Sequence, residues 1–250
     1  MGRVENYLKE RRAARGPLHF SLIDPHKVTD ESSLRSVAET LASFGTDAFL
    51  VGGSLGVSPF KMAGVVEVLR EFGLPVIIFP GDLTNIVPGA DAVLFMSLLN
   101  SDDPYYIVGA QMQGAFLVQE YGLEPLPTAY IIVGHGGAAG FVGRARPIPW
   151  DRPEIAAAYA LSARMLGMRF VYLEAGSGAP RHIPSDFARA VKRVAPDLFL
   201  IIGGGIREAR VAEELARSGA DALVTGSLVE ERLEAVREII EAVRRASLEP

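Results

Sequence analysis

The sequence predicts an α/β fold, a modified (β/α)8 TIM barrel that lacks the outer helix after its third strand. Three observations indicate this class: eight short apolar runs, helical patterns between most of them, and glycine-rich loops after the last two. A length of 250 residues with 49% hydrophobic content suits one such domain spanning residues 1–250. A doubly wound open sheet is the alternative, and the number of runs favours the barrel.

The eight apolar runs are the expected strands. Each is nearly continuous in apolar residues, as are the strands of a parallel sheet that is covered on both faces. The runs are LHFSLID (18–24), DAFLVG (47–52), PVIIFPG (75–81), DAVLFMSLL (91–99), TAYIIVG (128–134), RFVYLEAG (169–176), LFLIIGGG (198–205) and DALVTGS (221–227).

Helical periodicity separates most of these runs, and the charged N-terminus is expected to be a helical extension. The expected helices cover residues 31–45, 59–73, 152–167, 184–195, 207–219 and 229–246. Only DLTNIVPGA (82–90) lies between the third and fourth runs, and with Pro88 and Gly89 it is too short for a covering helix. The gap left in the barrel wall could admit a long apolar ligand or be covered by another subunit.

Composition excludes several classes of function. A net charge of −5 offers no broad basic surface for nucleic acid. The absence of cysteine excludes disulfides, a thiolate nucleophile and cysteine-based zinc sites. No apolar run approaches the ~18 residues that suggest a membrane span, so we expect a soluble cytoplasmic protein, with peripheral contact to a membrane left open.

The loops after the seventh and eighth runs predict a phosphate site. They read GGGIR (203–207) and TGS (225–227), and each leads into a helical pattern. Glycine lets the backbone approach an anion, and free N–H groups at a helix start point toward it. Paired loops in these two places form the phosphate site that recurs in barrels, although either loop alone reads equally well as a turn.

Glu174 ends the sixth run, where a barrel strand aims its side chain at the substrate. A carboxylate there can orient a substrate hydroxyl or accept its proton. The alternative is a salt bridge to an arginine such as Arg207. Tyr172 lies two residues earlier on the same face of the strand, where it either donates to the same ligand or packs as a core tyrosine.

Asp24 and Ser54 follow the first and second runs and suit a hard cation such as Mg²⁺, which keeps several waters and leans on substrate phosphates. From spacing alone, the simpler interpretation is that both residues cap turns or helices. Lys27 follows a proline turn rather than ending a strand, which disfavours an aldolase-type Schiff base. The sequence assigns no definite role to His26, His135 or Trp150.

Five motifs together resemble the geranylgeranylglyceryl phosphate synthases, over nearly the whole chain: DPHK (24–27), GGS (52–54), YLEAGSG (172–178), GGGIR (203–207) and TGS (225–227). The resemblance implies a barrel missing one outer helix, the substrates sn-glycerol 1-phosphate and geranylgeranyl diphosphate, and a Mg²⁺ cofactor held by Asp24 and Ser54. The implied glycerol-phosphate contacts are Tyr172, Leu173, Glu174, Ala175, Gly176, Ser177, Gly178, Gly204, Gly205, Gly226 and Ser227.

Two departures refine this resemblance. The related bacterial heptaprenylglyceryl phosphate synthases commonly read Glu-Tyr-Ser-Gly where this chain has Glu174, Ala175, Gly176 and Ser177. That difference resembles a second archaeal group, for which a homo-hexamer is expected, with a dimer as the alternative. His26 replaces an acidic residue found in some members. A phosphosugar isomerase or aldolase-type barrel and a non-catalytic binding barrel remain the alternative functions.

Overall fold

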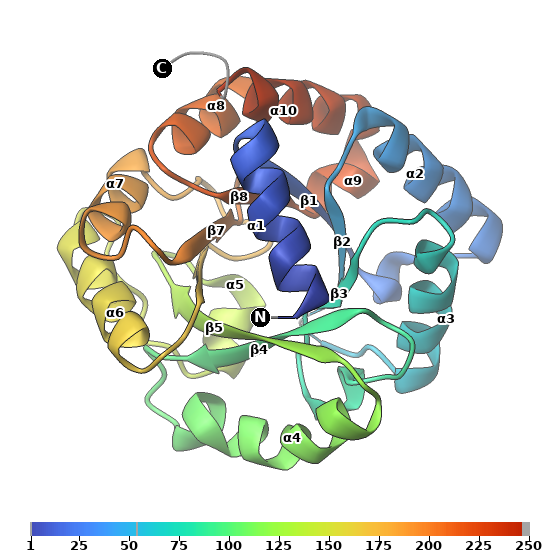
Figure 1. Ribbon diagram of the computed structural model, residues 1–250, viewed down its shortest axis with the longest axis horizontal. Coiled ribbons are helices and arrows are strands. Elements are labelled where there is room, and N and C mark those ends of the chain that lie inside the picture. Colours follow the sequence, from blue (N-terminus) through green and yellow to red (C-terminus); the bar gives the residue numbers. More distant parts are fainter. Residues whose placement is uncertain (1, 54, 247–250) are drawn as a thin grey trace.

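Eight parallel strands close into a barrel in the computed structural model, which describes residues 2–53 and 55–246 (Figure 1). Each strand pairs with the next along the chain, and the last pairs with the first. Closure confirms the barrel and excludes the open sheet. The strands are β1 (Leu18–Ile23), β2 (Ala48–Val51), β3 (Val76–Ile78), β4 (Ala92–Leu98), β5 (Glu124–Ile132), β6 (Phe170–Glu174), β7 (Phe199–Gly203) and β8 (Ala222–Thr225).

A ring of helices surrounds the barrel, as expected from the alternating pattern (Figure 1). Between β3 and β4 the described chain has only the short turn η2 (Leu83–Asn85), which confirms the missing outer helix. The α-helices are α2 (Glu31–Phe44), α3 (Pro59–Arg70), α4 (Ala110–Glu120), α5 (Gly137–Val142), α6 (Pro153–Met165), α7 (Ser185–Val194), α8 (Ala209–Arg217), α9 (Ser227–Glu231) and α10 (Leu233–Arg245). A short 3-10 turn, η1 (Pro25–Lys27), follows β1, and a π-helical segment, η3 (Tyr105–Gly109), leads into α4.

Side chains alternate along each strand between two separate cores. Leu18, Phe20, Phe170 and Tyr172 point into the barrel and fill it. Their neighbours, such as Leu173, pack in the layer between the strands and the outer helices. The barrel is therefore a packed core, and ligand space is confined to its ends.

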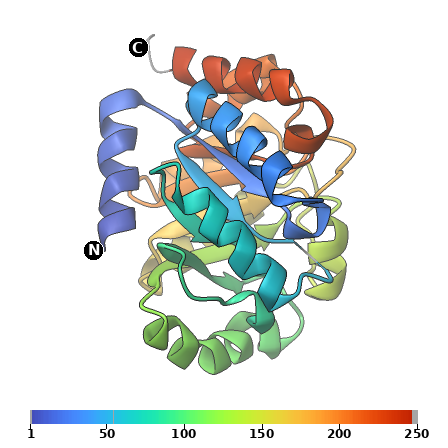
Figure 2. The same cartoon turned by 90° about the vertical axis from the view of Figure 1, so that its right-hand side faces the viewer.

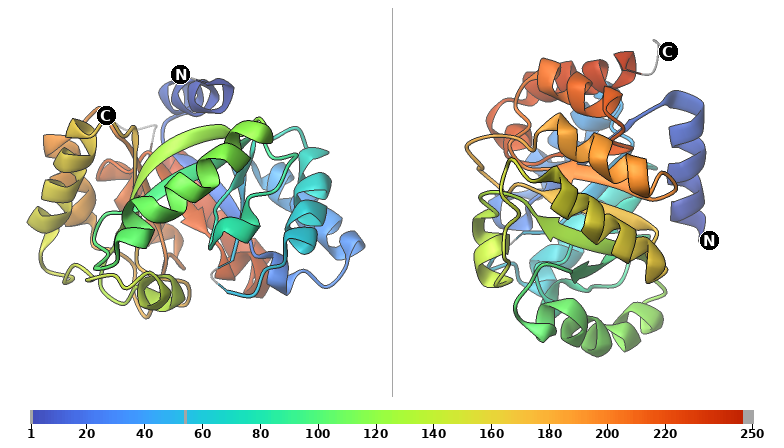
Figure 3. Two further views of the ribbon diagram at one scale, coloured as in Figure 1. Left: turned by 90° about the horizontal axis from the view of Figure 1, so that it is seen from below. Right: turned by 90° about the vertical axis from the view of Figure 1, so that its left-hand side faces the viewer.

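Helix α1 (Arg3–Arg15) lies across the end of the barrel where the strands begin (Figure 2). Val4 and Leu8 are buried against the interior side chains. The Glu124 carboxylate accepts the N–H groups of Val4 at 2.7 Å and Glu5 at 2.9 Å, which satisfies two unpaired donors at the helix start. Figure 3 shows α5 at the opposite end, so only the end where the strands finish is left for a substrate.

The structure differs from the sequence predictions most clearly at α4, at the last helix and at β5. The helix α4 was not predicted because its apolar residues, among them the exposed Met112 and Phe116, do not form one stripe. The expected last helix breaks at Arg232 into α9 and α10. Strand β5 begins at Glu124, four residues early, since Pro125 and Pro127 pair only with β4 and need no N–H on their other side.

No helix in the described part of the chain is long and apolar enough to cross a membrane.

Candidate active site

A cavity of about 450 Å³ opens at the carboxyl ends of the strands. One part of its wall is polar and comes from β6 and from the loops after β7 and β8. The other part is apolar and comes from β3, β4, the η2 turn and α4. The polar wall includes Glu174, Ser177, Gly178, Gly204, Gly205, Arg207, Thr225, Gly226 and Ser227, and the apolar wall includes Phe79, Leu83, Ile86, Val93, Met96, Gly114 and Val118.

Glu174 lies at the junction of these two walls, at the end of β6. Its side chain is buried, and its Oε1 accepts the N–H of Gly176 at 2.6 Å. Burial raises the pKa of the Glu174 carboxyl from 4.5 to about 7, against hydrogen bonds from Gly176, Tyr172 and Tyr130 that lower it. The carboxylate is held by these three donors rather than by Arg207, and it is poised to exchange a proton near neutral pH.

Tyr172 and Tyr130 meet Glu174 from inside the barrel. Both are buried, and burial together with the Glu174 charge raises the pKa of each phenol well above 10, so both remain protonated donors. Their ring centroids are 5.4 Å apart, and Phe79 packs against both at 5.1 and 5.7 Å. The sequence analysis identified Tyr172 but missed Tyr130, although the two lie opposite each other on β5 and β6.

Glycine is required at the end of β7 because neighbouring side chains lie too close for any Cβ. The Cβ of any other residue at position 203 would lie 2.1 Å from the Tyr172 hydroxyl. At Gly204, which has φ of +84°, it would lie 2.6 Å from the Glu174 Oε1. The loop thus brings its backbone directly against the carboxylate, where a substrate held by the loop would meet Glu174.

Unpaired backbone donors gather on these loops. Within the described chain, the N–H groups of Gly204, Gly205 and Ser227 have no hydrogen-bond acceptor in the protein. Helix α8 begins only at Ala209, so the donors after β7 belong to the glycine turn itself and not to the first turn of a helix. These donors suit an anion such as a phosphate.

The segment after Glu174 follows the predicted site only in part. Ser177 and Gly178 line the cavity. The side chains of Leu173 and Ala175 are buried in the outer layer, so these residues can contact a ligand only through their backbone. Gly176 has φ of +104° and nests against Gly137 of α5, where an added Cβ would lie 2.5 Å from the Gly137 nitrogen.

Asp24 lies at the end of β1, close to the cavity wall at Gly53. Its Oδ1 accepts the N–H of His26 at 2.9 Å, so the turn-capping interpretation of this residue is correct. A Cβ on Gly53 would lie 2.5 Å from the same oxygen. The predicted partner Ser54 lies outside the described residues. Among those that are described, no three His, Asp or Glu side chains converge as an all-protein cation site would require.

Neither Trp150 nor His135 lines the cavity. His135 is exposed and accepts the Gly137 N–H at 3.3 Å through Nδ1. The Arg181 guanidinium stacks over the Trp150 ring, 4.9 Å from its centroid. The Arg181 carbonyl oxygen lies 2.4 Å from where a Cβ on Gly205 would stand, which links the tryptophan to the β7 loop.

These features define a class: a (β/α)8 barrel whose β7 and β8 loops offer backbone donors to an anion beside a buried carboxylate at the end of β6. Comparison with known proteins gives the particular group. The chain belongs to the PcrB family, whose family model matches residues 6–244.

Its relatives share one description. The geranylgeranylglyceryl phosphate synthase of Metallosphaera sedula is 50% identical over 98% of this chain and 96% of its own. That of Aeropyrum pernix is 50% identical over 98% of each. The crystal structure of (S)-3-O-geranylgeranylglyceryl phosphate synthase from Thermoplasma acidophilum in complex with sn-glycerol-1-phosphate superimposes with a TM-score of 0.91 at 38% identity, covering 98% of this chain and 99% of the other.

Proposed function

We propose that this protein transfers a geranylgeranyl group from its diphosphate to the C3 hydroxyl of sn-glycerol 1-phosphate, releasing diphosphate. The names of relatives 50% identical over nearly the full chain support this reaction, as does the structural match to a relative that holds sn-glycerol-1-phosphate. The observation that carries the proposal is the position of Glu174 between the anion-binding loops and the apolar wall.

The polar wall would hold the glycerol phosphate. The unpaired N–H groups of Gly204, Gly205 and Ser227 would receive the phosphate oxygens, and Gly226, Ser177 and Gly178 complete the same wall. The glycerol hydroxyl would then reach Glu174, which lies against Gly204.

Glu174 would accept the proton of the attacking hydroxyl. The hydroxyl oxygen forms a bond to carbon 1 of the prenyl chain as the bond from that carbon to the diphosphate breaks, and the proton passes to the carboxylate. A pKa of about 7 makes Glu174 a competent acceptor near neutral pH. Tyr172 and Tyr130 keep the carboxylate oriented through their hydroxyl groups.

The apolar wall would hold the prenyl tail. This wall includes residues of the η2 turn and of α4, and the described chain has no outer helix between β3 and β4. Phe79, which packs against Tyr172 and Tyr130, lies where the apolar wall begins. Arg207 is exposed on the cavity wall and would face the anionic groups.

Mg²⁺ is the proposed cofactor, with Asp24 and Ser54 as its protein ligands. The single carboxylate at Asp24 fits this ion, because Mg²⁺ uses one or two carboxylates and completes its shell with water and substrate phosphates. When bound, the ion would neutralise charge on the departing diphosphate.

The direct test is product formation. The protein is incubated with radiolabelled sn-glycerol 1-phosphate and a series of prenyl diphosphates of increasing length, and the lipid product is extracted and identified. We expect the geranylgeranyl ether, and little product from sn-glycerol 3-phosphate. A protein that binds glycerol phosphate but forms no ether with any prenyl diphosphate would contradict the proposal. In the described part of the chain no lysine lines the cavity, so an aldolase-type Schiff base has no support.

We also propose a cytoplasmic homo-oligomer, with the hexamer expected from the resemblance and a dimer as the alternative. Large exposed apolar side chains support association: Phe60 is 90% exposed, Phe116 79% and Phe141 88%. Light scattering of the purified protein measures the assembly directly, and flotation with anionic vesicles tests peripheral membrane contact.

A further inference from the structure

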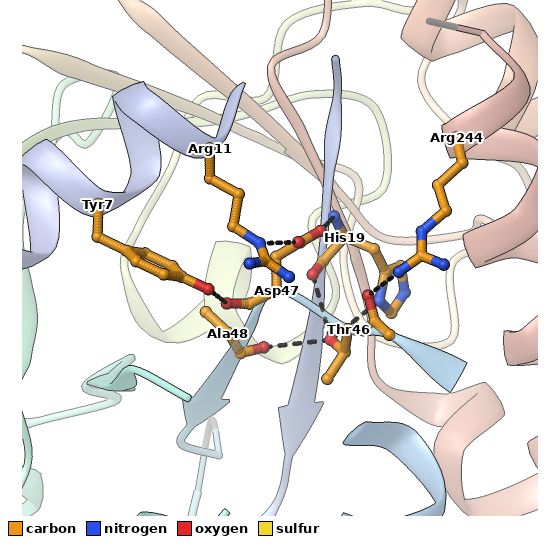
Figure 4. A network of polar contacts seen from close by, with 8 residues as sticks. Tyr7, Arg11, His19, Thr46, Asp47, Ala48 and Arg244 are labelled. Atoms are coloured by element: carbon orange, nitrogen blue, oxygen red, sulfur yellow. Dashed lines mark hydrogen bonds and ion pairs between the residues drawn. The ribbon is translucent and has the colours of Figure 1, made fainter. Parts of the chain in front are cut away.

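His19 is a buried titratable residue that the proposed reaction does not use. It lies on β1 with its side chain directed outward, opposite to Leu18 and Phe20, into the layer beneath the outer helices (Figure 4). Both of its ring nitrogens have hydroxyl partners: Nδ1 is 3.2 Å from Thr46 Oγ1, and Nε2 is 2.9 Å from Thr225 Oγ1.

The hydrogen bonds of Thr46 fix the tautomer of His19. Thr46 Oγ1 has two carbonyl neighbours, His19 O at 3.1 Å and Ala48 O at 3.3 Å, and these can only accept. Its single proton is therefore used on a carbonyl. Ser21 Oγ, at 3.0 Å, and His19 Nδ1 must then both donate to the Thr46 oxygen.

It follows that Nδ1 of His19 carries the proton and that Nε2 is an acceptor. The Thr225 hydroxyl is the donor to Nε2. Burial and the Arg244 charge lower the pKa of His19 to about 3, so this neutral tautomer persists at ordinary pH. Arg244 itself donates to Gly45 O at 3.0 Å, beside Thr46 (Figure 4).

The backbone of His19 is held at the end of the barrel where the strands begin. The His19 backbone N–H donates to Asp47 Oδ2 at 3.0 Å, while Arg11 of α1 pairs with Asp47 Oδ1 and the Tyr7 hydroxyl donates to Asp47 O at 3.1 Å (Figure 4). The backbone and ring of His19 are thus both held in place, and its Nε2 accepts a hydrogen bond from β8.

Thr225 contacts both His19 and the cavity. It is the last residue of β8, is 2% exposed, and lies on the cavity wall directly before Gly226 and Ser227. Threonine is branched at Cβ, so a hydrogen bond that fixes its hydroxyl also restricts its side-chain rotamer and the backbone path that follows.

We propose that His19 is a positioning residue: by accepting the Thr225 hydroxyl at Nε2, it fixes the Gly226–Ser227 backbone in the geometry that binds the substrate phosphate. This inference rests on the proposed function, since it requires the phosphate to lie on the β8 loop.

The test compares Thr225→Val, which removes the donor at nearly constant shape, with Thr225→Ser, which keeps it. We expect Thr225→Val to raise the KM for sn-glycerol 1-phosphate roughly tenfold, and its calorimetric Kd equally, with kcat and the KM for the prenyl diphosphate within about twofold. Thr225→Ser should restore the wild-type KM. A purely structural role would lower Tm and the active fraction but leave the KM for glycerol phosphate unchanged, and that result would overturn the inference.

A double-mutant cycle tests the pairing itself. His19→Leu should raise the same KM, and His19→Leu with Thr225→Val should be no worse than the larger single effect, because both remove one interaction. Effects that multiply would count against the pairing. The product assay on the wild type separates the inference from the proposed function: ether formation together with an unchanged KM in Thr225→Val contradicts only the role of His19, whereas no ether from the wild type contradicts the proposed function itself.

Discussion

The hydroxyl of Tyr172 occupies the space in which any residue other than glycine at position 203 would place its side chain. Only 2.1 Å separates that oxygen from an ideal Cβ on Gly203. Gly203 is the last residue of β7 and Tyr172 lies inside β6, so the contact joins neighbouring strands directly beneath the candidate site. The fit couples the packing of the barrel to the orientation of Glu174.

Gly203→Ala is therefore expected to displace Tyr172. We expect a loss of about 1–3 kcal/mol in the free energy of unfolding, measured by urea denaturation, and a large fall in kcat. Gly203→Ala combined with Tyr172→Phe should recover only part of the stability, because the oxygen is removed but the ring atoms Cζ and Cε1 would still lie 2.9 and 3.0 Å from the added Cβ. The matched control is Gly64→Ala in α3, where nothing lies within 4 Å of the added methyl and a stability gain of roughly 0.5–1 kcal/mol is expected. A Gly203→Ala protein as stable as the wild type would contradict the packing argument.

The pH dependence of kcat/KM should show an ascending limb near pH 7. Glu174 must be ionised to accept a proton, and its pKa is raised to about 7. Glu174→Gln should lower kcat by roughly 10²–10⁴ and remove that limb. The exposed Glu238→Gln is the control, and it should leave both unchanged. The substrate phosphate also titrates near pH 6, so a limb that persists in Glu174→Gln would belong to the substrate and not to the enzyme.

Tyr130→Phe should move the same limb to higher pH. The Tyr130 hydroxyl lowers the pKa of Glu174 by donating to its charged form, so its removal raises that pKa. We expect an upward displacement with substrate binding unchanged, measured from kcat/KM between pH 5 and pH 9. A limb displaced toward lower pH would show that Tyr130 acts on Glu174 in some other way.

The stability difference between Glu174→Gln and the wild type should depend on pH. The folded-state pKa of Glu174 is raised from 4.5 to about 7, so between these values the folded protein holds a proton that the unfolded chain releases. The free energy of unfolding of the wild type therefore falls as pH rises through this window, by about 3 kcal/mol in total. The glutamine variant lacks this dependence.

Urea titrations of both proteins at pH 5 and pH 8 check this expectation. The free energy of unfolding of Glu174→Gln, relative to that of the wild type, should be higher at pH 8 than at pH 5, as expected where a buried functional charge costs stability. A constant difference between the two proteins would mean that the Glu174 carboxyl titrates normally in the fold.

Asp24→Asn should weaken the dependence on Mg²⁺ while keeping the turn, because the amide oxygen can still accept the His26 N–H. We expect the Mg²⁺ concentration that gives half-maximal rate to rise at least about tenfold, since the one carboxylate ligand is lost. Asp30→Asn is the control, since Asp30 likewise caps a helix by accepting the Ser33 N–H at 2.8 Å but has no part in the proposed metal site. Equal Mg²⁺ dependence in Asp24→Asn and the wild type would remove Asp24 from the metal site.

Much of the barrel could be predicted because its strands and most of its helices carry local patterns. The apolar runs located all eight strands, and the short connection at 82–90 correctly indicated a missing helix. The start of β5 was missed because Pro125 and Pro127 argue against a strand until it is known that only one edge of that segment is paired. Helix α4 was missed because its buried residues do not outweigh exposed Met112 and Phe116.

The residues of the candidate site that directly end or follow a strand could be predicted from the sequence. Those that join the site only through contacts between strands could not. Glu174 and the glycine loops could be found from position alone. Tyr130 could not, since an aromatic residue within an apolar strand reads as core until its register with Tyr172 is known. The pairing of His19 with Thr225 joins residues 206 positions apart and has no local pattern.

Trp150 gives the chain a built-in optical probe. It is the only tryptophan in the sequence, and its ring lies beneath Arg181, whose carbonyl abuts Gly205 on the β7 loop. Emission from a single indole comes from one environment, so any rearrangement of that loop on filling the cavity is reported without a label. Stopped-flow fluorescence with each substrate in turn would therefore resolve the order in which the two enter.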